Sequence, residues 1–156
     1  MKEKILEAFR ELGFKLEEEG MGYCFNYEGL NLLYMYNEND EEFLNIALPG
    51  IVEVEEDRML QICALLEKIN STLKYVKTYM LGTSVWLFYE RELFGEEDLM
   101  TVISRMILHL EAGLVFARKA MAEIEETMAN DSSDDDTAES AEDIVAEEIA
   151  DDEDNE

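Results

Sequence analysis

The sequence predicts one α+β domain, built from a helix, an antiparallel meander, a second helix, a β-hairpin and a long C-terminal helix. Apolar residues recur at helical spacing near the beginning, middle and end of the chain, and alternate every second residue in between. They make up 47% of 156 residues, enough for a single core. The third observation is a change of composition, which divides the chain into a domain at 1–129 and a disordered acidic tail at 130–156.

The first predicted helix covers residues 2–12. Ile5, Phe9 and Leu12 lie on one side at helical spacing, and Gly13 follows where a helix commonly ends. The period then changes to two, with Gly-containing turns between apolar runs, which is typical of short antiparallel strands. We expect four of them in succession, around residues 14–16, 23–27, 30–36 and 43–48.

A second helix is predicted at about 55–70, because acidic residues open it and apolar residues share one side after them. The runs 75–80 and 85–89 flank a short connection with Gly82 and predict a hairpin. The third helix is expected from 96 to about 128. At ~1.5 Å per residue it measures roughly 45 Å, longer than the roughly 36 Å diameter of such a domain, so its far end should overhang.

Two groups of residues are candidates for protein binding. The apolar stripe of the third helix narrows after Gly113, which predicts that Leu114, Met121 and Ile124 are exposed for a partner, for a second copy, or for neither. The other group is Tyr34 and Tyr36, which share one side of a predicted strand. An alternating aromatic set is either the core side of a sheet or a protein-binding face.

The charge of the chain excludes several classes of partner. It has 39 Asp and Glu against 12 Lys and Arg, a net charge of −27, and the residues before 130 alone carry −13. Such a surface repels nucleic acid and anionic lipid, so we expect neither as a partner. The N-terminus lacks the apolar run of a signal peptide, and the stretch 101–110 contains Arg105 and His109, so we expect no membrane segment and a cytoplasmic location.

No residues with catalytic or metal-binding spacing are found in the sequence. His109 is the single histidine, and Cys24 and Cys63 are too far apart for a CxxC pair and are expected to be buried thiols. Phosphate-binding glycine motifs and the GxSxG motif are absent. We therefore predict no catalytic residues, no metal and no cofactor, and a protein that is not an enzyme.

The order of elements over about residues 1–128, together with the acidity and the closing helix, resembles the type III secretion chaperone-like fold. In particular it is similar to the YbjN-type domains, which are described as candidate bacterial sensory transduction regulators. Secretion chaperones are typically cytoplasmic homodimers that hold an extended client segment on apolar patches of sheet and helix. The resemblance implies a homodimeric binding module; the long acidic tail departs from the chaperone pattern.

Two functions follow as hypotheses. The first is a non-enzymatic, chaperone-like module that holds a segment of a client protein on apolar surface of sheet and helix. The alternative is a regulator that acts through its tail, where 14 acidic residues lie within 27 positions, as a decoy for basic nucleic-acid-binding proteins. Binding through the tail should weaken steeply with salt and disappear when residues 130–156 are removed.

Overall fold

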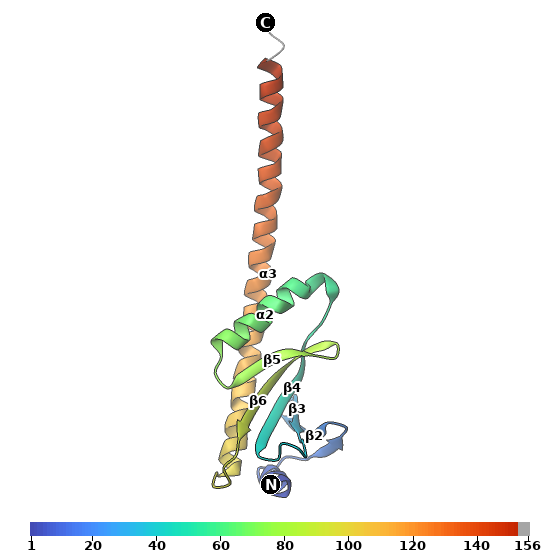
Figure 1. Ribbon diagram of the computed structural model, residues 1–156, viewed down its shortest axis with the longest axis vertical. Helices are drawn as coiled ribbons and strands as arrows, with labels where there is room; N and C mark the ends of the chain where they lie inside the picture. The colour runs from blue at the N-terminus through green and yellow to red at the C-terminus, as the bar shows by residue number, and fades with distance from the viewer. Residues whose placement is uncertain (153–156) are drawn as a thin grey trace.

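The computed structural model describes the backbone of residues 1–152 and the side chains of residues 1–133. The architecture is α+β, with one antiparallel sheet and a long closing helix, as predicted (Figure 1). In chain order the elements are α1 (Lys2–Glu11), β1 (Glu17–Glu19), β2 (Gly22–Tyr27), β3 (Leu30–Met35), β4 (Phe43–Glu53), the 3-10 turn η1 (Glu56–Arg58), α2 (Met59–Thr72), β5 (Val76–Leu81), β6 (Ser84–Glu92) and α3 (Leu99–Asp152).

The six strands form one sheet in the order β1-β2-β3-β4-β6-β5, and every neighbouring pair is antiparallel. The first four strands follow the chain as a meander. The hairpin β5–β6 then docks with its second strand against β4, so β6 lies inside the sheet and β5 forms its edge. This position explains why the sequence of β6 is apolar almost without a break.

Strand β4 is longer than predicted. We expected it to end before Pro49, but it continues to Glu53. Its pairing with β6 shifts register between Leu48 and Val52, and Pro49 lies within that irregularity. A proline is tolerated there because a bulge does not require its missing N–H for the ladder.

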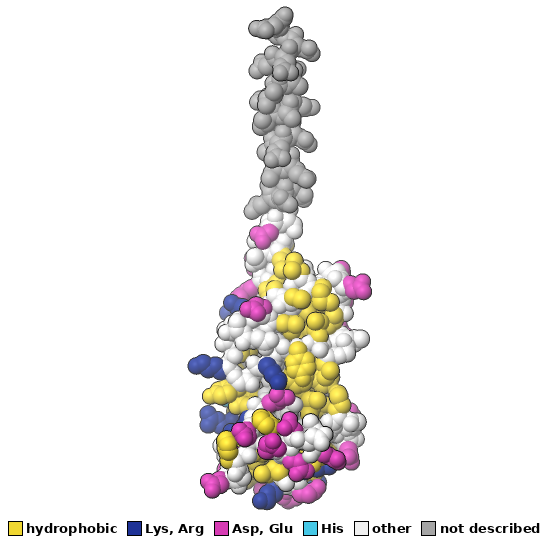
Figure 2. Space-filling view, viewed as in Figure 1, with side chains coloured by type: hydrophobic (Ala, Val, Ile, Leu, Met, Phe, Trp, Pro, Cys, Tyr) yellow, Lys and Arg dark blue, Asp and Glu magenta, His cyan; other side chains and the backbone are white. Residues whose placement is uncertain are grey.

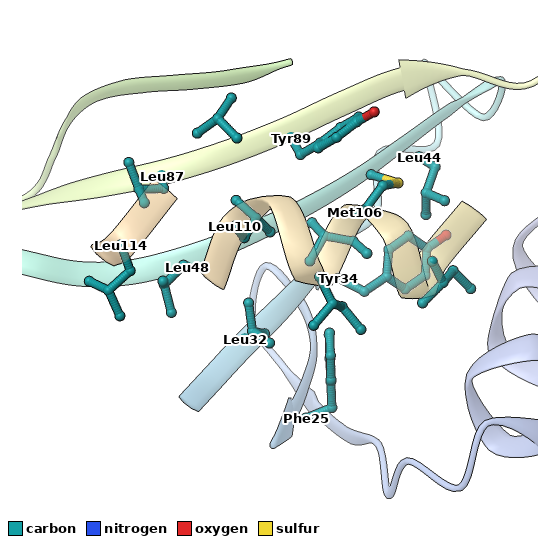
Figure 3. Packing of buried hydrophobic residues seen from close by; sticks show 14 of the residues in the cluster. Phe25, Leu32, Tyr34, Leu44, Leu48, Leu87, Tyr89, Met106, Leu110 and Leu114 are labelled. Atoms are coloured by element: carbon teal, nitrogen blue, oxygen red, sulfur yellow. The ribbon is translucent and has the colours of Figure 1, made fainter. Parts of the chain in front are cut away.

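The core lies between one face of the sheet and the three helices. Figure 3 shows side chains from β2, β3, β4 and β6 pointing towards α3, among them Phe25, Tyr34, Leu44 and Leu87. From α3 the side chains of Ile103, Met106 and Leu110 are at most 1% exposed. The aromatic alternation in the meander therefore marks the covered side of the sheet.

Helix α3 begins at Leu99, just after Asp98, which accepts a hydrogen bond of 2.7 Å from the Thr101 hydroxyl. This bond lowers the pKa of Asp98. The helix projects beyond the sheet, as its predicted length required (Figure 1). The disorder predicted for residues 130–156 remains a prediction. The backbone of α3 is described through to Asp152, while the side chains from 134 onwards and the residues 153–156 lie outside the described part.

Both edges of the sheet are protected against pairing with another strand. The edge strand β1 consists of three exposed glutamates, and charge on an edge disfavours pairing. At the other edge the Asn70 side chain of α2 bonds the backbone of β5: it accepts from the Thr78 N–H at 2.8 Å and donates to the Thr78 carbonyl at 3.0 Å. The amide thus occupies the position of a neighbouring strand at the middle of β5.

Replacing Asn70 by alanine is expected to lower the free energy of unfolding by about 1–2 kcal/mol, because two part-buried backbone groups lose their partner. The variant should also associate more at high concentration, because the edge is open. Urea denaturation and light scattering measure the two effects. Ser71→Ala is the matched control, since its hydroxyl makes only an exposed bond of 3.4 Å to Lys68; equal results for both variants would contradict this role of Asn70.

Candidate protein-binding site

The second face of the sheet carries apolar side chains and is not covered by a helix. Here Leu33, Ala47 and Phe88 form a separate buried cluster, surrounded by partly buried side chains that all come from strands. We call this surface the outer sheet face. Its members, in chain order, are Cys24, Leu33, Met35, Phe43, Asn45, Ala47, Lys77, Tyr79, Leu81, Trp86, Phe88 and Glu90.

Strand register places these side chains in rows across the sheet. Leu33 is paired with Ala47, and Ala47 with Phe88, so three strands contribute one apolar row. The adjacent row contains Met35, Asn45 and Glu90, again as direct partners. Cross-strand neighbours of this kind are within contact distance, so the face is a continuous surface rather than a set of isolated apolar residues.

Three aromatic rings cover the middle of the outer sheet face. The ring of Tyr79 lies parallel to that of Phe88 at a centroid distance of 4.1 Å. The ring of Trp86, two residues before Phe88 on the same strand, lies 5.9 Å from the Phe88 ring. Phe88 is fully buried by this stacking, whereas Tyr79 is 40% exposed. Figure 2 shows hydrophobic side chains gathered at the level of α2 and β5, with acidic ones below.

A hollow of about 630 Å³ lies beside this stack. Its apolar walls are Met21, Met35, Phe43 and Tyr79. Asn45 lies in the hollow and donates through Nδ2 to Glu90 Oε1 at 2.9 Å, which fixes the orientation of the amide, because a carboxylate accepts only. Its other end, Oδ1, is buried and has no hydrogen-bond partner among the described residues. A buried acceptor without a donor is rare in folded proteins.

The charge in the hollow is negative. Asp40 and Glu90 line it, and no lysine or arginine does among the described residues. Lys77 pairs with Glu90 at its border. Burial and the nearby Glu90 raise the pKa of Tyr79, against the opposing effect of Lys77. The hollow therefore offers apolar contact together with hydrogen-bond acceptors and negative charge, which suits a ligand that carries donors or cations next to apolar groups.

Four of the five residues predicted as binding surface lie outside the hollow. Leu114 and Met121 are 6% and 7% exposed, so the expectation that they are accessible is wrong: β4 and α2 cover that side of α3. Tyr34 is 1% exposed and belongs to the core. Ile124 is partly buried and lines a shallow groove between α2 and α3, where a binding role remains a prediction.

Tyr36 is the one predicted residue that reaches the hollow. Its hydroxyl donates to Glu41 at 2.6 Å, and this bond raises its pKa to about 12. A role in binding remains a prediction for this residue also. Of the two thiols, Cys24 is partly buried with its pKa raised to about 11, mainly by desolvation, while Cys63 is exposed, contrary to expectation.

The residues that make the outer sheet face were not recognised from the sequence, although one signal points to them. Trp86 and Phe88 alternate with the buried Val85, Leu87 and Tyr89, so β6 is apolar on both sides. An antiparallel strand with one solvated face normally alternates apolar and polar residues. Apolar residues at both odd and even positions of β6 therefore indicate that the second face of the sheet is also a contact surface.

Comparison with known proteins gives matches among solved structures. The crystal structure of YbjN from E. coli, a candidate transcription regulator, is similar with a TM-score of 0.60 over 76% of this chain and 92% of that one, at 12% sequence identity. The fold is of the YbjN type. A protein from Methanothermobacter thermautotrophicus is similar with a TM-score of 0.52, over 81% of this chain and 97% of that one, at 16% identity. No family model matches the sequence, and no curated protein matches it significantly.

The likeness covers fold only, because both identities are low. It supports the predicted resemblance to YbjN-type domains, while the resemblance to secretion chaperones stays an expectation. Within this fold, the outer sheet face combines exposed aromatic side chains with a buried, unpartnered acceptor among the described residues.

Proposed function

We propose that this protein is a non-enzymatic binding module that holds an extended segment of another protein on the outer sheet face. The observation that carries the proposal is the buried Asn45 Oδ1 without a donor among the described residues, set in an apolar hollow. A bound segment that supplies an N–H or a cation there satisfies this acceptor, and its apolar side chains extend the Tyr79 stack. The occupant is a segment with alternating apolar and basic residues.

Charge supports this choice of occupant. The domain has a net charge of −13 before residue 130, and the hollow contains Asp40 and Glu90 without a lining cation among the described residues. Acidic segments are repelled and basic ones attracted, with more effect on association at low salt. The same charge opposes direct contact with DNA, so a regulatory role of the kind suggested for YbjN would here act through a protein.

The test is fluorescence anisotropy of the full-length protein with three synthetic peptides of equal length. One alternates apolar residues with lysine, one alternates the same apolar residues with glutamate, and one alternates serine with lysine. The first is expected to bind at least about tenfold more tightly than either of the others, because it alone offers both apolar area and donors. Equal binding of the glutamate peptide, or no binding of the first peptide, would overturn the proposal.

Two variants locate the site. Phe43→Ser with Tyr79→Ser removes exposed aromatic area and should weaken the lysine peptide about tenfold. Asn45→Val removes the acceptor and should weaken it as well, while leaving the denaturation midpoint unchanged or higher, because an unsatisfied buried oxygen is lost. Leu60→Ser is the control, since Leu60 is 70% exposed on α2, away from this face; a loss of binding in this control as large as in the others would rule the outer sheet face out.

A further inference from the structure

The side of α3 that points away from the core carries apolar residues over about two turns. Leu108, Ala112 and Val115 follow one another at spacings of four and three residues, which places them along one side of the helix. All three are exposed, Leu108 to 52% and Val115 to 63%. The opposite side carries the core residues already described. We call these three residues the α3 stripe.

A helix that is apolar on both sides is normally buried on both. The part of α3 from Leu99 to Ser133 is long and apolar enough to cross a membrane by length and composition, yet only 39% of its most apolar window is buried. A single helix of this kind is weak support for a membrane span, since core helices pass the same test. The finding does show that α3 presents more apolar surface than the domain itself covers.

The stripe is bordered by cations. Arg105 and Lys119 lie on the same side of the helix as Leu108, and Arg118 lies next to it, as the helical repeat requires. All three are exposed. None of them forms an ion pair with an acid among residues 1–133, although this part of the chain contains many more acids than bases. The nearby Glu111 interacts with the hydroxyl of Tyr27, where burial and then the Glu111 charge raise the tyrosine pKa.

A second copy of the chain fits this surface poorly. In a two-fold antiparallel pair that brings Leu108 of one copy against Val115 of a second copy, the helical repeat places Arg105 beside Lys119 of that second copy. Like charges so close are unfavourable. Further along α3 the same side carries Ala122 and Glu126, which offer little apolar area. The chain therefore does not supply its own complement.

We propose that the α3 stripe docks an amphipathic helix of a partner protein, one that has aliphatic residues on its contact side and acidic residues at the borders. Its aliphatic side chains cover Leu108 and Val115 and pack over the small Ala112 between them, and its carboxylates pair with the bordering cations. This is the helix-on-helix mode of recognition, with contacts at i, i+4 and i+7. The surface is separate from the outer sheet face and prefers the opposite charge, so the two sites take different partners.

The test uses the full-length chain and two labelled helical peptides with the same leucine pattern, one with glutamate and one with lysine at the bordering positions. The glutamate peptide is expected to bind at least about tenfold more tightly. Arg118→Glu with Lys119→Glu should reverse this preference, and Leu108→Ser with Val115→Ser should weaken the glutamate peptide about tenfold. Leu60→Ser and Tyr79→Ser should leave it unchanged; the second also separates this site from the outer sheet face.

Three results would overturn the proposal. The first is that the glutamate peptide binds no better than the lysine peptide. The second is that the serine and charge-reversal variants still bind the glutamate peptide as the wild type does. The third result is a wild-type dimer by light scattering that becomes a monomer in Leu108→Ser with Val115→Ser, because the occupant is then a second copy. Circular dichroism of each variant, with an unchanged denaturation midpoint, shows that the changes act on binding and not on folding.

Discussion

Phe9→Ala is expected to lower the free energy of unfolding by about 3–5 kcal/mol, the range for truncating a buried phenylalanine. The side chain of Phe9 is fully buried. Its ring lies 4.8 Å from that of Phe25, 5.6 Å from that of Tyr34 and 6.1 Å from that of Phe14. The ring joins α1 to β2 and β3, so its loss leaves a cavity and frees the helix. Urea denaturation followed by circular dichroism measures the effect.

Phe94→Ala is the matched control for this prediction. The same side chain is removed, but Phe94 is 77% exposed in the turn before α3, and surface changes of this kind stay within about 0.5 kcal/mol. A loss of stability in Phe9→Ala no larger than in Phe94→Ala would mean that α1 does not hold to the sheet as described.

Gly22→Ala should be the other strongly destabilising change, with an expected loss of about 3 kcal/mol, the upper part of the range for overpacking. Gly22 begins β2 and lies against the backbone of β3. A Cβ placed on it would come within 1.9 Å of the Tyr34 carbonyl oxygen and 2.9 Å of the carbonyl carbon. Backbone atoms cannot turn aside as a side chain can, so the pairing of β2 with β3 must open locally.

Gly20 provides the control two residues away. A Cβ on Gly20 meets nothing within 4 Å, so Gly20→Ala should change the free energy of unfolding by less than about 0.5 kcal/mol. Denaturation curves of the two variants, recorded under the same conditions, give the two changes in the free energy of unfolding for comparison. If the two substitutions have the same effect, close packing at Gly22 is not what requires glycine there.

Local periodicity was sufficient to predict the order and type of the elements. The helix over 2–12 agrees with α1 to within one residue, and the predicted hairpin is β5–β6. The position of β6 between β4 and β5 was not predictable in the same way. It depends on pairing between strands far apart in the chain, for which a single sequence carries no local signal.

The candidate site was predicted less well than the fold, for a physical reason. In β3, Tyr34 and Met35 are adjacent apolar residues whose side chains point to opposite faces of the sheet. The sequence does not say which of the two faces the helices cover. The structure places Tyr34 in the core and Met35 on the outer sheet face. Similarly, Leu114 lies in a narrowing stripe that was expected to be exposed, but residues of β4 pack beside it and leave it 6% exposed. Coverage is a property of the assembled fold.

The closed edges of the sheet restrict how a ligand can be held. A segment that paired with a sheet edge would be held by hydrogen bonds of its own backbone amides. A proline in the segment would remove one of these bonds, because it has no N–H. The three charged side chains of β1 disfavour strand pairing at one edge, and the Asn70 amide already bonds the backbone of β5 at the other. A segment lying across the outer sheet face is instead recognised by its side chains. Such a surface tolerates proline in its ligand and selects by the spacing of apolar and basic groups, not by backbone conformation.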